Sequence, residues 1–126
     1  MTPSEHPFRV LVVEDEPLIA MIIEDAVEAL GCEMVGPFAD LGSAFEGATS
    51  QVFDCAILDV NIRGGLSYPV ATYLIDHGYP ILLATGYQGS SLPELLAVQQ
   101  CLAKPYSSAQ LEHALRRLCD RVSRRH

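Results

Sequence analysis

The segment Cys55-Ala56-Ile57-Leu58-Asp59 places four consecutive apolar residues directly before a carboxylate. A strand with one face in water alternates apolar and polar side chains, and this segment shows no alternation. An uninterrupted apolar run is instead typical of a strand that is covered on both faces in a parallel sheet. We therefore expect residues 55–58 to form an interior strand of a parallel sheet that is packed between helices.

Apolar segments of the same kind recur along the chain, at residues 8–13, 32–37, 80–84 and 101–103. Between them, apolar residues recur with helical spacing. The expected helices run from Pro17 to Leu30, from Leu41 to about Ala48, from Val70 to Ile75, from Pro93 to Val98, and from Ser107 or Ser108 to Val122, with Asp40 and Ser67 as further caps. This alternation predicts an α/β fold of the doubly wound (βα)5 kind, with a five-stranded parallel sheet. The 126 residues have room for one such domain, with its core at about residues 8–122.

The composition argues against several classes of protein. The chain carries 16 acidic and 8 basic residues, a formal net charge of -8, which disfavours binding to nucleic acid through phosphate contacts. No stretch approaches the roughly 18 uninterrupted apolar residues of a membrane span, and the N-terminus lacks the apolar core of a secretion signal. The 4 cysteines form no C-x-x-C pair, so we expect buried thiols in a reducing compartment and no metal cluster among them. We therefore expect a cytoplasmic protein that contacts neither nucleic acid nor a membrane.

The basic residues are concentrated near the C-terminus. Residues 106–126 contain Arg116, Arg117, Arg121, Arg124 and Arg125. These arginines are expected either to offset the dipole at the end of a last helix or to meet an acidic partner.

Polar residues follow most of the predicted strands. Glu14 and Asp15 follow the first strand, Asp59 the third, Thr85 the fourth and Lys104 the fifth. Since parallel strands point the same way, these side chains should meet at one rim of the sheet, where open α/β sheets bind their ligands. Carboxylates about 4 Å apart repel one another by about 4 kcal/mol at an effective dielectric near 20. We therefore expect a cation among them.

Magnesium fits this expectation because Mg²⁺ takes carboxylate and carbonyl oxygens and leaves coordination positions for phosphate oxygens. Thr85 and Lys104, the only lysine of the chain, complete a cradle for a phosphoryl group. Phosphoryl transfer mainly requires positioned groups and charge neutralisation, and a carboxylate can act as its nucleophile by forming an acyl phosphate. The residues at the strand ends thus predict Mg²⁺-dependent phosphoryl chemistry.

Four motifs give the chain a family resemblance: Leu11-Val12-Val13-Glu14-Asp15-Glu16, Ile57-Leu58-Asp59, Ala84-Thr85-Gly86 and Lys104-Pro105. In order and spacing they resemble the receiver domain of two-component response regulators, the CheY-like family, from Val10 to about Val122. The resemblance implies a flavodoxin-like fold with strand order 2-1-3-4-5. It also implies a signalling protein and not an enzyme, whose only chemistry is self-phosphorylation and autodephosphorylation.

The resemblance further implies a role for each residue at the rim. Asp59 is expected to accept a phosphoryl group from a phosphohistidine on a sensor histidine kinase. Magnesium is expected to be held by the side chains of Glu14, Asp15 and Asp59 and the backbone carbonyl of Asn61. Thr85 and Lys104 are expected to hold the phosphoryl oxygens, and the Lys104–Pro105 peptide bond is expected to be cis.

The chain departs from the common receiver pattern at the position three residues before the lysine. Many receivers carry an aromatic switch residue there, whereas this chain has Cys101, which we expect in the core. Leu83-Ala84-Thr85-Gly86-Tyr87 is similar to a bacterial subgroup whose strand reads Phe-Ala-Thr-Gly-Tyr, which lacks that aromatic residue and whose partner kinases are often of the HWE/HisKA2 type. Tyr87 or the segment Gly86–Ser91 is then expected to carry the conformational signal.

The leading interpretation is a stand-alone switch or phosphate shuttle whose output is another protein. One alternative is a Mg²⁺-dependent aspartyl-phosphate hydrolase, a class that commonly has a second acid where this chain has Asn61. A second alternative is a flavodoxin-like cofactor-binding module. Such a module would have a Ser, Thr and Gly loop for phosphate after the first strand, where this chain has Glu14-Asp15-Glu16.

Overall fold

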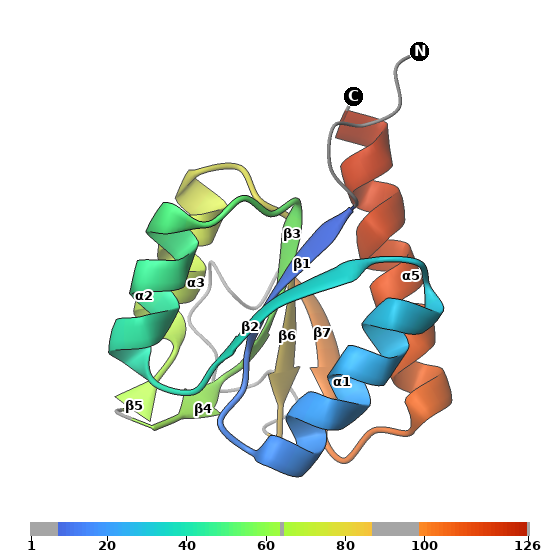
Figure 1. Ribbon diagram of the computed structural model, residues 1–126, viewed down its shortest axis with the longest axis horizontal. Coiled ribbons are helices and arrows are strands. Elements are labelled where there is room, and N and C mark those ends of the chain that lie inside the picture. Colours follow the sequence, from blue (N-terminus) through green and yellow to red (C-terminus); the bar gives the residue numbers. More distant parts are fainter. Residues whose placement is uncertain (1–7, 64, 87–98, 126) are drawn as a thin grey trace.

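A parallel sheet forms the centre of the protein (Figure 1). The computed structural model describes residues 8–63, 65–86 and 99–125. Within these ranges, β1 (Arg9–Val13), β2 (Glu33–Phe38), β3 (Cys55–Asp59), β6 (Ile81–Thr85) and β7 (Gln100–Ala103) pair in the order β2-β1-β3-β6-β7, and all four pairings are parallel. Because β6 and β7 are the fourth and fifth strands of this sheet along the chain, the predicted order 2-1-3-4-5 is confirmed.

Helices cover both faces of the sheet. In Figure 1, α2 (Leu41–Ser50) and α3 (Tyr68–Asp76) lie on one side of the strands, and α1 (Pro17–Ala29) and α5 (Ser108–Arg125) lie on the other. Side chains along each strand alternate between the two layers, so that Leu11 and Leu58 pack with α2 and α3 while Val10 and Ile57 pack with α1 and α5. The absence of polar alternation in β3 is thereby explained, since all five of its residues are buried.

The helix starts follow from local chemistry. The Asp40 carboxylate accepts a hydrogen bond from the Ser43 backbone N–H at 2.8 Å, which caps α2 as predicted. Ser107 caps α5 in a reciprocal arrangement, because its hydroxyl accepts from the Gln110 backbone N–H and the Gln110 side chain accepts from the Ser107 N–H. Ser67 precedes α3 but makes no side-chain cap, because its hydroxyl donates instead to the Asp59 carbonyl oxygen at 2.7 Å.

One strand departs from regular pairing in a way that positions the site. The register between β1 and β2 shifts between Leu11 and Val13. At this shift Gly36 has a φ of 115°, and a Cβ atom there would lie 2.8 Å from the Val12 carbonyl oxygen, so only glycine fits. Beyond the shift, the Glu14 backbone N–H donates to the Phe38 carbonyl at 3.0 Å, which fixes the chain where the first carboxylate follows β1.

Two of the connecting segments differ in outcome. One expected loop is bordered by short strands, and one expected helix lies outside the described residues. The sequence Arg63-Gly64-Gly65 predicts a loop, and the structure has a short antiparallel pair on either side of it, formed by β4 (Asn61–Ile62) and β5 (Gly65–Leu66), so that Gly65 belongs to a strand. The helix expected from Pro93 to Val98 lies outside the described residues. None of the described helices is long and apolar enough to cross a membrane.

The expectation that Cys101 lies in the core is wrong, because its side chain is exposed. Along β7, whose only described neighbour is β6, Leu102 alone is buried. Successive side chains of a strand point to opposite faces of the sheet. Cys101 precedes Leu102, so its side chain points away from the layer that covers Leu102.

Candidate functional site

Three carboxylates meet at the rim formed by the carboxyl ends of the strands. Glu14, Asp15 and Asp59 each offer an oxygen atom, and these atoms all lie within 4.8 Å of one another. The convergence follows from the topology, because β1 and β3 are parallel neighbours in which Val13 pairs with Leu58, the residues just before Glu14 and Asp59. The structure therefore brings together the acidic residues that the sequence analysis placed at this rim.

Glu14 is the most deeply buried of the three acids, with 2% of its surface exposed. Its Oε2 atom accepts a hydrogen bond from the Glu16 backbone N–H at 3.1 Å, whereas Oε1 is buried without a partner among the described residues. The pKa of Glu14 is raised to about 7, mainly by burial and next by the nearby negative charge of Asp59, against the opposing effects of the Glu16 N–H and Lys104. A proton or a cation is needed to stabilise this carboxyl group.

Asp59 is held from two sides. Its Oδ2 atom lies 2.7 Å from Lys104 Nζ, and its Oδ1 atom accepts a hydrogen bond from the Asn61 backbone N–H at 3.1 Å. The Asp59 side chain is 5% exposed and that of Lys104 is 31% exposed, so the ion pair lies where the buried rim opens to solvent. The Asp59 carboxylate is therefore fixed in orientation and remains accessible from the side of the amine.

Lys104 reaches this position because β7 ends one residue before it. Its backbone N–H donates to the Thr85 carbonyl at 2.9 Å, continuing the pairing between β6 and β7 past the last strand residues. Thr85 itself is buried, with 2% of its surface exposed. The Lys104–Pro105 peptide bond is cis. Thr85 and Lys104 thus occupy adjacent positions on the rim beside Asp59.

The donor set fits a hard divalent cation. Among the described residues, Glu14, Asp15 and Asp59 are the one group in which three such ligand atoms converge, and all of these atoms are carboxylate oxygens. Hard cations such as Mg²⁺ prefer oxygen ligands and commonly bind through a few carboxylates. The unpartnered Oε1 atom of Glu14 also points to a cation. A buried carboxylate oxygen without a hydrogen bond is costly unless it binds a proton or a cation.

Sequence reasoning missed two residues that contribute to the site. Ser67 is fully buried and holds the Asp59 backbone carbonyl, as described above. Tyr106 has a buried hydroxyl without a partner among the described residues, and burial raises its pKa to about 12, with Glu14 and Asp59 adding to the shift. The position of Tyr106 directly after Lys104-Pro105 was the available signal, because the chain is still at the rim there.

A shallow apolar pocket of about 390 Å³ adjoins Lys104. Its lining combines Lys104, Pro105 and Tyr106 with residues near the start of α1, namely Glu16, Ile19 and Ile22. On the same helix, the side chains of Leu18 and Met21 are 71% and 59% exposed. Apolar surface therefore continues from the rim onto α1.

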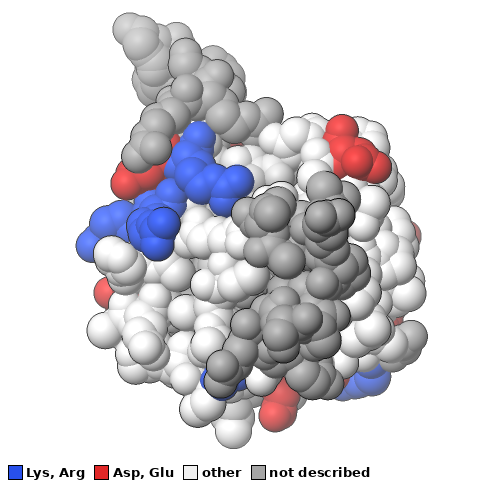
Figure 2. Space-filling model, turned by 180° about the vertical axis from the view of Figure 1, so that it is seen from behind, with Lys and Arg blue, Asp and Glu red and all other residues white. Residues whose placement is uncertain are grey.

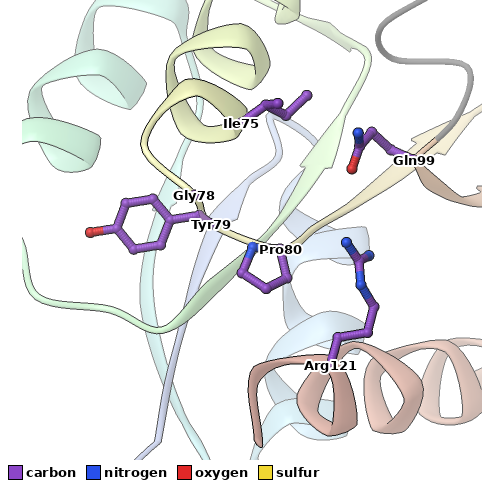
Figure 3. A pocket seen from close by; sticks show the side chains of 6 residues that line it. All are labelled: Ile75, Gly78, Tyr79, Pro80, Gln99 and Arg121. Carbon is purple, nitrogen blue, oxygen red and sulfur yellow. The ribbon is translucent and has the colours of Figure 1, made fainter. Parts of the chain in front are cut away.

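A second hollow, of about 290 Å³, lies at the opposite end of the sheet. Figure 3 shows its lining: Ile75, Gly78, Tyr79, Pro80, Gln99 and Arg121. Pro80 directly precedes β6, whereas the rim residue Thr85 ends that strand. This hollow therefore contains none of the predicted site residues and is separate from the acidic cluster.

The arginines of α5 contribute to a basic surface. Arg116 and Arg117 are exposed and Arg121 is half-buried, and Figure 2 shows basic side chains gathered toward one edge of the face seen there. Among the described residues, the ion pairs are Arg9 with Glu33 and Lys104 with Asp59, so these arginines of α5 have no acidic partner there.

Of the two residues named in place of the usual aromatic switch, Cys101 is the one that the structure describes. Tyr87 lies outside the described residues. Cys101 is on β7, exposed, and its thiol donates to the Gln99 carbonyl at 3.5 Å. Burial of part of its surface raises the pKa of Cys101.

The chain resembles solved receiver domains along most of its length. A solution structure of SdrG from Sphingomonas melonis Fr1 is 38% identical, covers 90% of this chain and 97% of SdrG, and superimposes with a TM-score of 0.76. A BeF3-activated conformation of SdrG from Pseudomonas melonis Fr1 is 36% identical over 91% of this chain and 98% of that chain, with a TM-score of 0.74. The receiver domain of the sensor histidine kinase PA1611 from Pseudomonas aeruginosa PAO1, with a magnesium ion coordinated in its active site cleft, is 26% identical over 91% of this chain and 99% of that chain, with a TM-score of 0.76. None of the curated proteins matches the chain.

A family profile agrees with the solved structures and with the geometry of the rim. The profile of the response regulator receiver domain matches residues 10–116, which include every residue of the acidic cluster and Lys104. Receiver domains are signalling modules of two-component systems that interact with sensor histidine kinases and bind Mg²⁺ at an acidic site. With its sheet order, its three converging carboxylates and its lysine at the expected place, this chain belongs to the response regulator receiver domain family.

Proposed function

We propose that this receiver takes a phosphoryl group on Asp59 from a sensor histidine kinase, in a reaction that requires Mg²⁺. The observation that carries the proposal is the position of the Asp59 carboxylate, 2.7 Å from the Lys104 amine and within 4.8 Å of the Glu14 and Asp15 oxygens. A carboxylate placed between a cation site and an amine can attack phosphorus while both neighbours neutralise the phosphoryl oxygens.

The chemistry divides among the residues of the rim. A carboxylate oxygen of Asp59 forms the new bond to phosphorus, and the bond from phosphorus to the donor histidine nitrogen breaks, leaving an acyl phosphate on Asp59. Lys104 and Thr85 hold the phosphoryl oxygens. The Glu14, Asp15 and Asp59 carboxylates and the Asn61 backbone carbonyl would hold Mg²⁺, which would neutralise negative charge on the phosphoryl group when bound.

The hydrogen bonds around Asp59 support its role as the acceptor. The Asn61 N–H on Oδ1 and the Lys104 amine on Oδ2 orient the carboxylate before any donor arrives. Ser67 fixes the backbone of the same residue by binding its carbonyl oxygen at 2.7 Å. A nucleophile held in this way loses little conformational freedom on reaction, which favours transfer.

The donor has to approach the rim from its open side. The pocket between α1 and residues 104–106 includes Lys104 and so lies on that side, and Leu18 and Met21 are exposed on the same helix. We infer that the phosphorylated domain of the kinase covers this apolar surface when its phosphohistidine reaches Asp59. The resemblance to the Phe-Ala-Thr-Gly-Tyr subgroup makes a kinase of the HWE/HisKA2 type the first candidate.

The way in which the phosphorylated protein passes on its signal is inferred from the same resemblance. We infer a cytoplasmic regulator whose receiver domain signals to another protein or passes its phosphoryl group on, without binding nucleic acid or a membrane directly. Cys101 replaces the usual aromatic switch, so Tyr87 or the segment Gly86–Ser91 is the proposed carrier of the conformational signal. The exposure of Cys101 supports this assignment, because a small exposed side chain cannot report on the interior as a large ring can.

Membership of the receiver family favours this function over the two alternatives. An aspartyl-phosphate hydrolase commonly needs a second acid two residues after its nucleophile, where this chain has Asn61. A flavodoxin-like cofactor site needs a phosphate-binding loop after β1, where Glu14, Asp15 and Glu16 supply negative charge. Repeated release of phosphate from small monoesters would favour the hydrolase, and a yellow purified protein would favour the flavin-binding module.

The direct test is intact-protein mass spectrometry after incubation with acetyl phosphate and Mg²⁺. The wild-type protein is expected to gain the mass of one phosphoryl group, and Asp59→Ala is expected to gain none. Chelation of Mg²⁺ with EDTA is expected to abolish the gain in the wild-type protein. An unchanged mass of the folded wild-type protein, or an equal gain in Asp59→Ala, would overturn the assignment of Asp59.

A further inference from the structure

The hollow of about 290 Å³ lies at the end of the sheet that is remote from the acidic cluster (Figure 3). It is bounded by the end of α3, the turn before β6, the residue before β7, and α5. Segments that are far apart in sequence therefore contribute to one cavity. The proposed phosphoryl transfer uses none of its lining residues, so the hollow can have a separate role.

The wall of the hollow next to α3 is a well-defined turn. Gly78 has a φ of 83°, a left-handed conformation that glycine adopts readily. Its N–H donates to the Ile75 carbonyl at 3.0 Å, and the Tyr79 N–H donates to the Leu74 carbonyl at 3.0 Å, the two bonds of the Schellman motif. The Tyr79 ring also stacks on Phe53, with ring centroids 4.4 Å apart. This side of the cavity is therefore formed before any ligand arrives.

Arg121 supplies positive charge to the hollow. Its side chain is half-buried, and Figure 3 shows its guanidinium group turned toward the same space as the Gln99 amide. The Nη1 atom donates a long hydrogen bond, of 3.4 Å, to the Ile81 carbonyl, and no acidic side chain among the described residues pairs with this guanidinium group. A guanidinium group has five N–H donors. Most of the donors of Arg121 are therefore available to a ligand in the hollow.

The charges around Arg121 favour an anion. Arg117 lies one helical turn earlier on α5 and is exposed, and Figure 2 shows basic side chains gathered toward one edge of the molecule. Asp120 is next to Arg121 in sequence but makes no ion pair with it in the described part of the chain. The last carbonyl groups of α3, which would disfavour an anion, accept the two hydrogen bonds of the turn. The positive charge of Arg121 is thus not cancelled locally.

The size and lining of the hollow define the class of ligand. At roughly 30 Å³ for each water-sized group, a volume of about 290 Å³ holds about ten non-hydrogen atoms. Ile75, Tyr79 and Pro80 give the hollow apolar walls, which favour a ligand with an apolar body. The planar guanidinium group of Arg121 fits a carboxylate through two parallel hydrogen bonds. A phosphate dianion carries more negative charge than one guanidinium group neutralises, so a monoanion is the better match.

We propose that this hollow binds a small carboxylic acid with an apolar body, whose carboxylate pairs with Arg121 while its apolar part packs against Ile75 and Pro80. Such a ligand contacts α3, the turn before β6 and α5 at the same time. Because the unfolded chain does not hold these segments together, binding stabilises the folded protein. The site is independent of Asp59, so it does not rest on the proposed phosphoryl transfer.

The test is a titration of the full isotope-labelled chain with sodium benzoate, followed by amide NMR spectra. Benzoate is expected to shift the backbone amide signals of Gly78, Tyr79 and Gln99 saturably, with a dissociation constant on the order of 1 mM for a ligand of this size. Benzamide has the same shape without the charge, and acetate has the charge without the ring. Each is expected to bind at least about tenfold more weakly, because one loses the charge-assisted hydrogen bonds and the other the apolar contact.

Two substitutions complete the test. Arg121→Gln is expected to weaken the binding of benzoate at least about tenfold and to leave that of benzamide unchanged. Arg116→Gln removes an exposed arginine of the same helix that does not line the hollow, and it is expected to bind benzoate like the wild-type protein. The proposal is overturned by equal binding of benzoate and benzamide, by an unchanged affinity of folded Arg121→Gln, or by the absence of saturable shifts at the hollow. The comparison of benzoate with benzamide on the wild-type protein decides the question even if Arg121→Gln does not fold.

Discussion

Lys104 Nζ lies 2.7 Å from Asp59 Oδ2, although 45 positions of sequence separate the two residues. The parallel pairing of β3 with β6 and of β6 with β7 brings them to the same rim, and the Lys104 N–H bond to the Thr85 carbonyl fixes the approach of the amine. Asp59 is nearly buried while Lys104 is partly exposed, so the carboxylate meets the amine where the rim opens to solvent.

Replacing Lys104 by alanine is expected to slow phosphorylation by acetyl phosphate at saturating Mg²⁺ by at least about tenfold. Removing one donor from a preorganised anion site typically costs about 10²–10³ in rate, and the partial exposure of Lys104 reduces the effect. The measurement is the rate of gain of phosphoryl mass. Arg9→Ala, which removes a basic residue from the other end of β1, is the control and is expected to keep the wild-type rate. Equal rates for Lys104→Ala and wild type would contradict a role for the amine in transfer.

The stability of the metal-free protein is expected to fall as pH rises from 4.5 to 7. Burial raises the pKa of Glu14 from 4.5 to about 7, so within this window the folded protein holds a proton that the unfolded chain has released. The contribution is present in full below pH 4.5 and is lost as pH rises through 7, and it is on the order of 1–3 kcal/mol. Urea unfolding in EDTA measures the effect.

Glu14→Gln provides the control for that titration because it removes the ionising group and keeps the shape of the side chain. Its stability is expected to change less than that of the wild-type protein between pH 4.5 and 7. Asp59→Asn is expected to lower the pKa of Glu14, because the negative charge of Asp59 contributes to raising it. A wild-type stability that rises throughout this window, with no difference in Glu14→Gln, would show that Glu14 ionises normally.

Tyr106→Phe is expected to leave the stability of the metal-free protein unchanged or to raise it by about 1 kcal/mol. The Tyr106 hydroxyl is buried without a partner among the described residues, and removing an unsatisfied buried polar group recovers its desolvation cost. Chemical denaturation of both proteins at pH 7 in EDTA measures the difference. Tyr68→Phe, at a partly buried tyrosine of α3, gives the comparison. A loss of more than about 1 kcal/mol in Tyr106→Phe would mean that the hydroxyl has a partner.

Two glycines of α2 are expected to respond in opposite directions to alanine. A Cβ atom on Gly47 would lie 2.6 Å from Cε2 of Phe38, so Gly47→Ala is expected to destabilise the protein by about 1–3 kcal/mol. A Cβ atom on Gly42 meets nothing closer than the Asp40 Oδ1 atom at 3.6 Å, so Gly42→Ala is expected to stabilise by about 0.5–1 kcal/mol. Thermal unfolding of the pair measures the contrast, and a stabilising Gly47→Ala would contradict the packing of Phe38 on α2.

The sheet and its rim could be predicted because their signals are local and repeated. The apolar run of β3 required cover on both faces, and the two helical layers supply it. Once the strands are parallel, their carboxyl ends must share one rim, so Glu14, Asp15, Asp59 and Lys104 could be placed together without knowledge of any distance.

Other features depend on packing between distant segments and left no local signal. The apolar neighbours of Cys101 predict a core position, but its side chain is exposed, and Leu102 alone is buried along β7. Ser67 is predicted to cap a helix. Its hydroxyl donates to the Asp59 carbonyl instead, which depends on how α3 packs against the end of β3. The unpartnered hydroxyl of Tyr106 likewise depends on its place beside Glu14, which a sequence pattern does not specify.

The central claim is that the phosphoryl group resides on the side chain of Asp59 as an acyl phosphate. Borohydride reduces an aspartyl phosphate to homoserine, so reduction after phosphorylation with acetyl phosphate and Mg²⁺, followed by peptide sequencing in a mass spectrometer, identifies the residue. The account predicts homoserine at position 59 and nowhere else. Phosphate recovered on a serine, threonine or histidine, with position 59 still aspartate, would contradict it.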